Sequence, residues 1–146
     1  KKQRRYYSGK KKRHTLKSQI IADQNTRQIV CTEVGNGRKH DYKLYKQSQT
    51  PIHPTITAEV DTGYQGLQKA HPNTEIPKKR SKKNPLTKTD KQRNQRISSS
   101  RVAIENIIRK LKIFRILAEK YRNRRRRFKL RLNLIAAIAN LLTKPI

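Results

Sequence analysis

A helical repeat of apolar side chains in the last third of the chain is the feature that most constrains its fold. The repeat consists of Ile104, Ile107, Ile108 and Leu111. The spacing i, i+3, i+4 and i+7 places these side chains on one face of an α-helix, and that face has to pack against another element. Only 32% of the residues are hydrophobic, so we expect a small core built from this helix and a few other apolar segments.

Two neighbouring segments predict a β-hairpin. Residues 16–22, LKSQIIA, and residues 27–34, RQIVCTEV, are rich in β-branched side chains, which favour strands. Residues 23–26, DQNT, between them have the composition of a turn. A short helix is predicted over residues 40–47, HDYKLYKQ.

The remaining elements indicate an α/β fold. Residues 56–66, ITAEVDTGYQG, predict a buried strand that stops at Asp61 and is followed by a glycine turn. A short strand is predicted over residues 74–79 and a second helix over residues 121–142. We divide the chain into a basic arm (1–15), a sheet portion (16–79), a basic loop (80–97) and a helical portion (98–146).

The charge of the chain indicates a polyanionic partner. Lys and Arg number 38 against 9 Asp and Glu, for a formal charge of +29. Nucleic acid is favoured because its phosphates release counterions when they are neutralised, and an acidic membrane surface is a weaker alternative. The longest apolar run, residues 132–142, is too short to span a bilayer. The expected phosphate contacts, for which a solvated surface is the alternative, are Lys10, Lys11, Lys12, Arg13, Lys78–Lys83, Arg101, Arg109, Arg124, Arg125, Arg126 and Arg127.

Three acidic residues are candidates for a catalytic role. Asp61 ends a predicted strand, where α/β proteins often place functional groups, although it could equally cap the amides of a turn. Glu105 lies beside the apolar stripe, and ion pairs with Arg101 and Arg109 at i−4 and i+4 are its simpler interpretation. Asp41 is an alternative acid, for which capping of the short helix is the preferred role.

Two carboxylates from separate elements can share hard divalent cations such as magnesium. In a basic protein that binds DNA, such a pair suggests phosphodiester chemistry with two metal ions. Four segments strengthen this interpretation, and they are YYSGKKKRHTLK (6–17), GNGRKHD (35–41), VDTGYQG (60–66) and RVAIENIIRKLKIFRIL (101–117). Together, and in this order, they resemble the C-terminal half of DDE transposases of bacterial insertion sequences, in the branch related to PIF/Harbinger elements.

The resemblance implies an RNase H-like fold and a metal site. It makes Asp61 the second catalytic aspartate and Glu105 the catalytic glutamate, which hold two Mg²⁺ or Mn²⁺ ions in the complete enzyme. The first aspartate of the family should precede residue 6, but KKQRR holds no acid there, and the chain has no methionine. We therefore expect a fragment with an incomplete RNase H-like fold, whose mixed sheet lacks its first strand and which is inactive alone.

The function expected from this resemblance is that of part of a transposase. The parent enzyme would cut and join phosphodiester bonds, with element ends and target DNA as partners and a homodimer in the synaptic complex. We expect a cytoplasmic, nucleoid-associated protein of a bacterium without membrane association. The alternatives are a non-catalytic basic nucleic-acid-binding protein and a decayed transposase remnant that binds DNA without cutting it. In a pure binding protein Asp61 and Glu105 would be structural.

Overall fold

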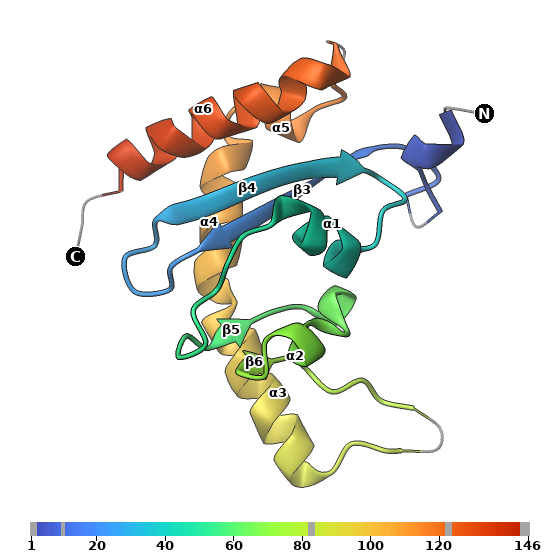
Figure 1. The fold of residues 1–146 in the computed structure, drawn as a ribbon, viewed down its shortest axis with the longest axis vertical. Helices are drawn as coiled ribbons and strands as arrows, with labels where there is room; N and C mark the ends of the chain where they lie inside the picture. Colours follow the sequence, from blue (N-terminus) through green and yellow to red (C-terminus); the bar gives the residue numbers. More distant parts are fainter. Residues whose placement is uncertain (1–2, 10, 82–83, 122–123, 144–146) are drawn as a thin grey trace. The chain divides into compact units, whose positions relative to one another are not determined.

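The computed structural model describes residues 3–9, 11–81, 84–121 and 124–143. These residues form helices and three two-stranded sheets, an α/β arrangement with helices at the C-terminal end of the chain (Figure 1). The contacts of the chain separate two compact units. The first unit comprises Lys1–Lys39 with Ala103–Ile146, and the second unit comprises His40–Val102.

The predicted hairpin is confirmed in the first unit. Strand β3 (Leu16–Ala22) pairs antiparallel with strand β4 (Ile29–Asn36), with Leu16 opposite Asn36. The turn between them is closed by Asp23, whose Oδ1 accepts hydrogen bonds from the Thr26 amide at 2.6 Å and the Thr26 hydroxyl at 2.8 Å. Aspartate in a turn commonly accepts such local bonds, so the sequence DQNT accounts for the connection.

The predicted apolar stripe packs within the first unit. It lies on helix α4 (Val102–Lys112), which is followed by the short helix α5 (Arg115–Ala118). Helix α6 (Phe128–Leu141) lies along β4 (Figure 1). The buried residues of this core come from β4, α4 and α6 and are Ile29, Ile107, Leu111, Ile135, Ala136 and Ala139. The apolar residues that follow a helical period and those of the predicted hairpin therefore pack into one small core.

The second predicted helix is shorter than its sequence pattern. It begins at Phe128 and not at residue 121, because the arginines before it form the 3₁₀ helix η3 (Arg125–Arg127). Asn140 joins α6 to β4, since its side-chain amide accepts a hydrogen bond from the Ile29 amide at 2.8 Å and donates one to the Ile29 carbonyl at 2.9 Å. In the described part of the chain no helix is long and apolar enough to cross a membrane.

The basic arm is folded against the hairpin within the first unit. It contains the 3₁₀ helix η1 (Gln3–Tyr6) and strands β1 (Tyr7–Ser8) and β2 (Arg13–His14), which pair antiparallel. The Thr15 amide donates to the Tyr6 carbonyl at 2.7 Å, and the Gly37 amide donates to the Thr15 carbonyl at 2.9 Å. A Cβ at Gly37 would lie 2.9 Å from the Tyr6 carbonyl oxygen, so the arm requires glycine at this contact.

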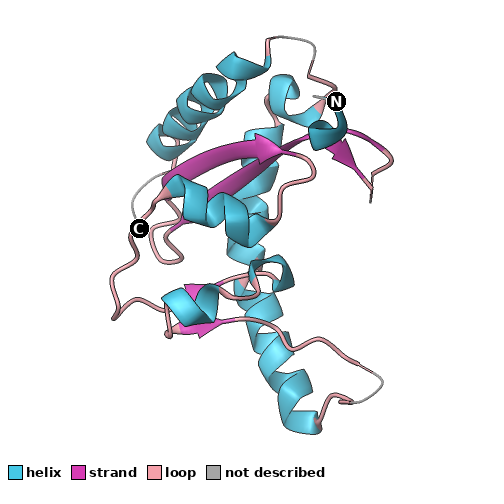
Figure 2. Cartoon of the chain, turned by 45° about the vertical axis from the view of Figure 1, so that its right-hand side comes forward, coloured by secondary structure: helices cyan, strands magenta, loops and turns pink. Residues whose placement is uncertain are grey.

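The second unit begins with helix α1 (Asp41–Ser48), which confirms the helix predicted over 40–47. Strands β5 (Ala58–Glu59) and β6 (Thr74–Glu75) pair parallel, and the 3₁₀ helix η2 (Thr62–Tyr64) and helix α2 (Leu67–Ala70) lie between them in sequence (Figure 2). Helix α3 (Lys88–Ser100) completes the unit. The fully buried large side chains of the second unit are Leu44, Leu67 and Ile97.

Two strand predictions in this region were wrong in extent. The segment 56–60 is not a buried strand, because only Ala58 and Glu59 pair and Ile56 is 55% exposed. Its partner β6 is also only two residues long, since Pro72 and Pro77 flank it and proline has no amide hydrogen to donate to a ladder. The described residues therefore form three separate two-stranded sheets in place of one mixed sheet.

The predicted basic loop 80–97 was wrong from residue 88 onward, where α3 begins. The helix starts with a capping box, in which the Asp90 amide donates to the Thr87 hydroxyl at 3.1 Å and the Thr87 amide donates to the Asp90 carboxylate at 3.1 Å. A hydrogen bond from Lys78, and then one from the Thr87 amide, lower the pKa of Asp90 to about 2. Residues 98–100, which the sequence division places at the start of the helical portion, form the last turn of α3.

Candidate active site and nucleic-acid interface

Asp61 stands at the start of the turn in the second unit that contains η2. Its Oδ1 accepts a hydrogen bond from the Thr62 amide at 2.6 Å, and its carbonyl accepts one from the Tyr64 amide at 2.9 Å. Asp61 therefore has the turn-capping role that the sequence left open. Its side chain is also 55% exposed, so the carboxylate remains accessible to a ligand from solvent.

Arg101 is the basic partner of Asp61 within the second unit. Its Nη1 lies 3.5 Å from Asp61 Oδ1, and its backbone forms the C-cap of α3. Such a half-exposed pair contributes about 0–1 kcal/mol, so it holds the carboxylate loosely. The role of Arg101 as a phosphate contact stays a prediction, although the structure places its guanidinium beside an acid.

Helix α1 packs on the same turn through its first two residues. A Cβ at Gly63 would lie 2.2 Å from Asp41 Oδ2, so the Asp41 carboxylate sits directly against this glycine. A Cβ at Gly66 would lie 3.1 Å from the Tyr42 ring. Burial, and then the charges of Asp41 and Asp61, raise the pKa of Tyr64 to about 12. The turn thus brings two carboxylates close to one tyrosine.

Glu105 lies in the first turn of α4 and is exposed. The ion pairs expected with Arg101 and Arg109 are not formed, because Arg101 turns to Asp61 and Arg109 donates to the Asn106 side chain at 2.8 Å. Among the residues that the structure describes, Glu105 has no salt bridge. It belongs to the first unit and Asp61 to the second, and their approach to a common site stays a prediction.

The donor chemistry of these acids suits hard cations. Carboxylate oxygens on exposed side chains are the ligands that Mg²⁺ and Mn²⁺ prefer. Within the described ranges there is no group of three or more His, Cys, Asp or Glu side chains that could hold a metal ion. Asp61 and Glu105 can thus each offer a ligand, but neither lies in a complete set.

A basic segment near each end of the first unit is exposed, and one stacking contact links η3 to the basic arm. The Arg125 guanidinium stacks over the Tyr6 ring at 4.2 Å from its centroid, which joins η3 to the basic arm. The neighbouring side chains of Lys11, Lys12, Arg13, Arg124, Arg126 and Arg127 are exposed. We call the side chains of residues 11–13 and 124–127 the basic surface. Lys10, predicted to belong to it, lies outside the described residues.

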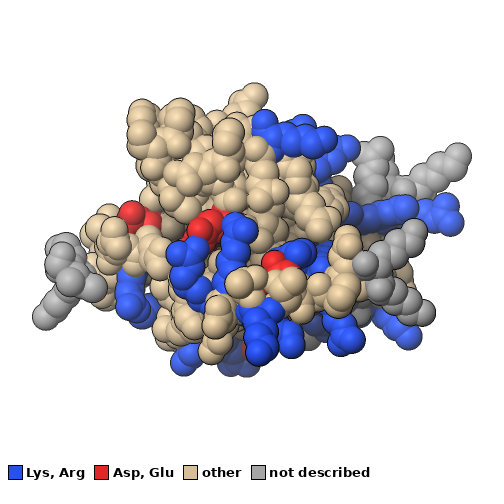
Figure 3. Space-filling view, turned by 90° about the horizontal axis from the view of Figure 1, so that it is seen from below, with Lys and Arg blue, Asp and Glu red and all other residues tan. Residues whose placement is uncertain are grey.

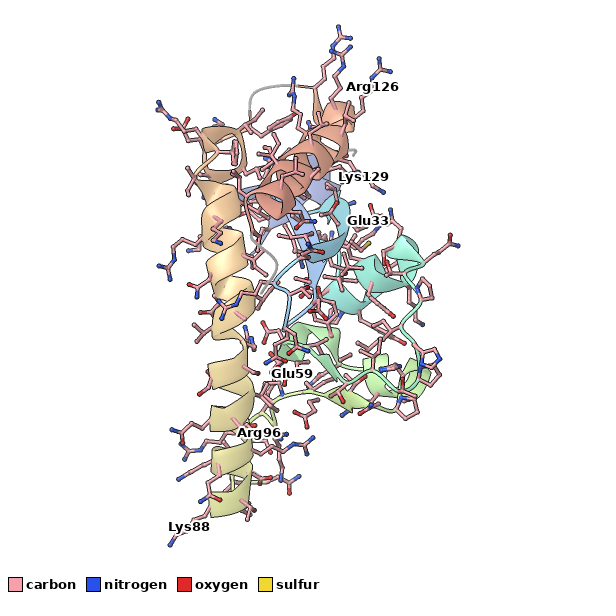
Figure 4. All side chains as sticks on the ribbon, turned by 90° about the vertical axis from the view of Figure 1, so that its left-hand side faces the viewer. Glu33, Glu59, Lys88, Arg96, Arg126 and Lys129 are labelled. Carbon is pink, nitrogen blue, oxygen red and sulfur yellow. The ribbon has the colours of Figure 1, made fainter. Side chains whose placement is uncertain are left out.

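Acidic side chains are few in this chain, and the buried acid of the first unit is already paired. Arg126 points away from the ribbon (Figure 4). Glu33 on β4 pairs with Lys129 at 2.8 Å. Burial opposes the charge of Glu33, but the hydrogen bonds from Lys129 and the Val34 amide outweigh it and lower its pKa. On the face drawn in Figure 3, which is seen from below Figure 1, Lys and Arg atoms likewise cover more of the surface than Asp and Glu atoms do.

Comparison with known proteins identifies the family. Residues 1–143 match the family described as DDE superfamily endonuclease. The chain belongs to this family. It is also 44% identical over 140 residues to a protein of Microchaete diplosiphon described as "Probable transposase for insertion sequence element IS702". The match covers 96% of this chain and 51% of that protein, so the chain spans about half the length of this curated relative. No solved structure matches the chain.

Membership of the DDE endonucleases confirms the resemblance drawn from the sequence, and the structure adds contacts that the sequence did not indicate. The packing of Asp41 on Gly63 joins two of the four motifs, GNGRKHD and VDTGYQG, in this DDE endonuclease chain. The sequence signal for this contact was Gly63. Its φ is not positive, so glycine is needed here for the space beside its Cα and not for backbone freedom.

Proposed function

We propose that this chain forms part of the catalytic region of a DNA transposase that cuts and joins phosphodiester bonds at the ends of an insertion sequence. The observation that carries the proposal is an exposed carboxylate, Asp61, on an ordered D-T-G-Y turn in a chain of the DDE endonuclease family. The similarity to a probable insertion-sequence transposase supports the reaction. The formal charge of +29 supports DNA as the substrate.

In this proposal Asp61 and Glu105 are the residues that would hold Mg²⁺ or Mn²⁺, together with an aspartate outside this sequence. Two such ions supply an activated oxygen nucleophile and stabilise the leaving oxygen of the phosphodiester. The turn fixes the backbone of Asp61 through the Tyr64 amide, and Arg101 attracts its carboxylate. The basic surface holds the DNA backbone. An RNase H-like arrangement of the complete catalytic region and a homodimer in the synaptic complex belong to the same proposal.

A second candidate function is DNA binding without cleavage, as in a decayed transposase. It is favoured by the basic surface, which is formed within the first unit alone and does not involve Asp61. This candidate and the transposase both predict salt-dependent DNA binding. They differ in whether Asp61 and Glu105 are needed for cleavage of the DNA strand.

Nicking of element-end DNA separates the two functions. The product of the whole reading frame that contains this chain is incubated with a labelled duplex of the element end and Mg²⁺, and cleaved strands are resolved under denaturing conditions. We expect Asp61→Asn and Glu105→Gln to lose nicking and to retain DNA binding. Glu119→Gln is the matched control, because Glu119 is an exposed helix-end glutamate whose only ion pair in the described structure is with Arg115. Nicking that survives both active-site substitutions would refute the site, and binding without any wild-type nicking would favour the second function.

A further inference from the structure

The first two residues of α1 cover both glycines of the D-T-G-Y-Q-G segment. Asp41 Oδ2 occupies the space beside Gly63, where a Cβ would come within 2.2 Å of it and within 3.0 Å of Asp41 Cγ. Gly63 has no positive φ, so its lack of a side chain serves this close approach. Gly66 has φ 99° and the Tyr42 ring against it. The turn is therefore seated on the N-terminal end of α1.

The hydrogen bonds around Asp61 are made within its own turn. The Thr62 amide bonds the Asp61 side chain, and the Tyr64 amide bonds the Asp61 carbonyl. Both bonds lie within the turn, so they fix its shape and not its direction. Tyr64 is half-buried, and the charges of Asp41 and Asp61 both act on its hydroxyl. From outside the turn, the Val60 amide bonds the Glu75 carbonyl at 3.0 Å and Arg101 lies 3.5 Å from Asp61, while Asp41 contacts Gly63 in the middle of the turn.

We propose that Asp41 is a positioning residue for Asp61: its carboxylate seats Gly63 and thereby fixes the direction in which the turn presents the Asp61 carboxylate. The proposal rests on the proposed function, which makes the direction of that carboxylate matter. Asp41 is half-buried and packed on the glycine, whereas Asp61 is exposed. Asp41 therefore acts through the turn, and Asp61 is the acid that faces a ligand.

A double-mutant cycle tests the contact in the 146-residue chain. Gly63→Ala, Asp41→Ala and the double variant are compared by the midpoint of urea unfolding. We expect Gly63→Ala to lower the midpoint clearly in the wild-type background, because its methyl group meets Asp41 Oδ2. The same change should lower the midpoint less in the Asp41→Ala background, where that oxygen is gone. Equal losses in both backgrounds would overturn the seating of Gly63 by Asp41.

A spectroscopic measurement decides the contact even if the alanine variants do not fold. Asp41→Asn keeps the shape of the side chain and removes its charge, and ¹⁵N-labelled glycine reports the amide resonance of Gly63. We expect the Gly63 resonance to shift in Asp41→Asn, because the carboxylate lies directly against this glycine, whereas Asp90→Asn, a control in the same unit, leaves it in place. An unmoved Gly63 resonance in Asp41→Asn would contradict the placement of Asp41.

The positioning role itself is tested by nicking kinetics of the full reading-frame product. We expect Asp41→Asn to slow the nicking step and raise the Mg²⁺ concentration needed for half-maximal rate, with DNA affinity unchanged. A wild-type rate with wild-type Mg²⁺ dependence would overturn positioning. If the wild-type protein does not nick, the proposed function fails and positioning fails with it, while the cycle and the Gly63 resonance still decide separately whether Asp41 seats the turn.

Discussion

Replacing Arg124, Arg126 and Arg127 with glutamine tests the basic surface of the first unit. All three side chains are exposed, and Arg125 is kept because it stacks on Tyr6 and so anchors the arm. If each arginine neutralises one phosphate of duplex DNA, each contributes about 0.9 to the slope of log affinity against log salt. The triple substitution should therefore reduce that slope by about 2.7.

The slope is measured by fluorescence anisotropy with a labelled duplex between 50 and 200 mM salt. The salt concentration rises fourfold over that range. A slope smaller by about 2.7 makes the loss of affinity over the range about 40-fold smaller for the triple variant than for the wild-type chain. The matched control changes three exposed bases of α3, namely Lys88, Lys91 and Arg93, to glutamine and removes the same charge from the second unit. An equal change of slope in both variants would show that overall charge, and not the basic surface, binds the DNA.

Two further predictions concern stability and use urea unfolding. Asn140→Ala should lower the free energy of unfolding by about 1–3 kcal/mol, because it removes two hydrogen bonds to the backbone of Ile29, a residue 8% exposed. The control Gln92→Ala, at an exposed position of α3, should change it by no more than about 0.5 kcal/mol. Asp90 has a pKa of about 2 in place of 3.8, so its contribution to stability is present above pH 3.8 and is lost as the pH falls towards 2. Asp90→Asn should flatten the stability profile in that window, and an unaltered profile would contradict the capping role.

Local patterns sufficed for the parts of the fold that local interactions determine. The hairpin 16–36 and the stripe on α4 follow from strand and helix periods, and both appear with shifts of a few residues. Helix α3 was missed because its exposed surface is polar and only Ile97 is fully buried. The start of α3 could nevertheless have been predicted, since Thr87 and Asp90 have the spacing of a capping box.

The site shows where sequence reasoning stops. Asp61 could be placed at a turn because a glycine follows two residues later, which is a local signal. The contact of Asp41 with Gly63 joins residues 22 positions apart, the difference between 63 and 41, and depends on how α1 packs. Arg101 has helical spacing to Glu105, yet it turns to Asp61, because a tertiary contact competes with a weak helix-surface pair.

The basic partners of the acidic side chains bear on the proposed binding of metal ions. Salt bridges in the described part of the chain include the pairs Glu33–Lys129, Asp61–Arg101, Glu75–Arg96, Asp90–Lys78 and Glu119–Arg115. Glu105 is exposed and has none within the described ranges, although bases outnumber acids 38 to 9. Its neighbour Arg109 bonds Asn106 instead. A carboxylate that pairs with no lysine or arginine of the described residues can take a metal cation without first displacing one of them, which suits the proposed role of Glu105.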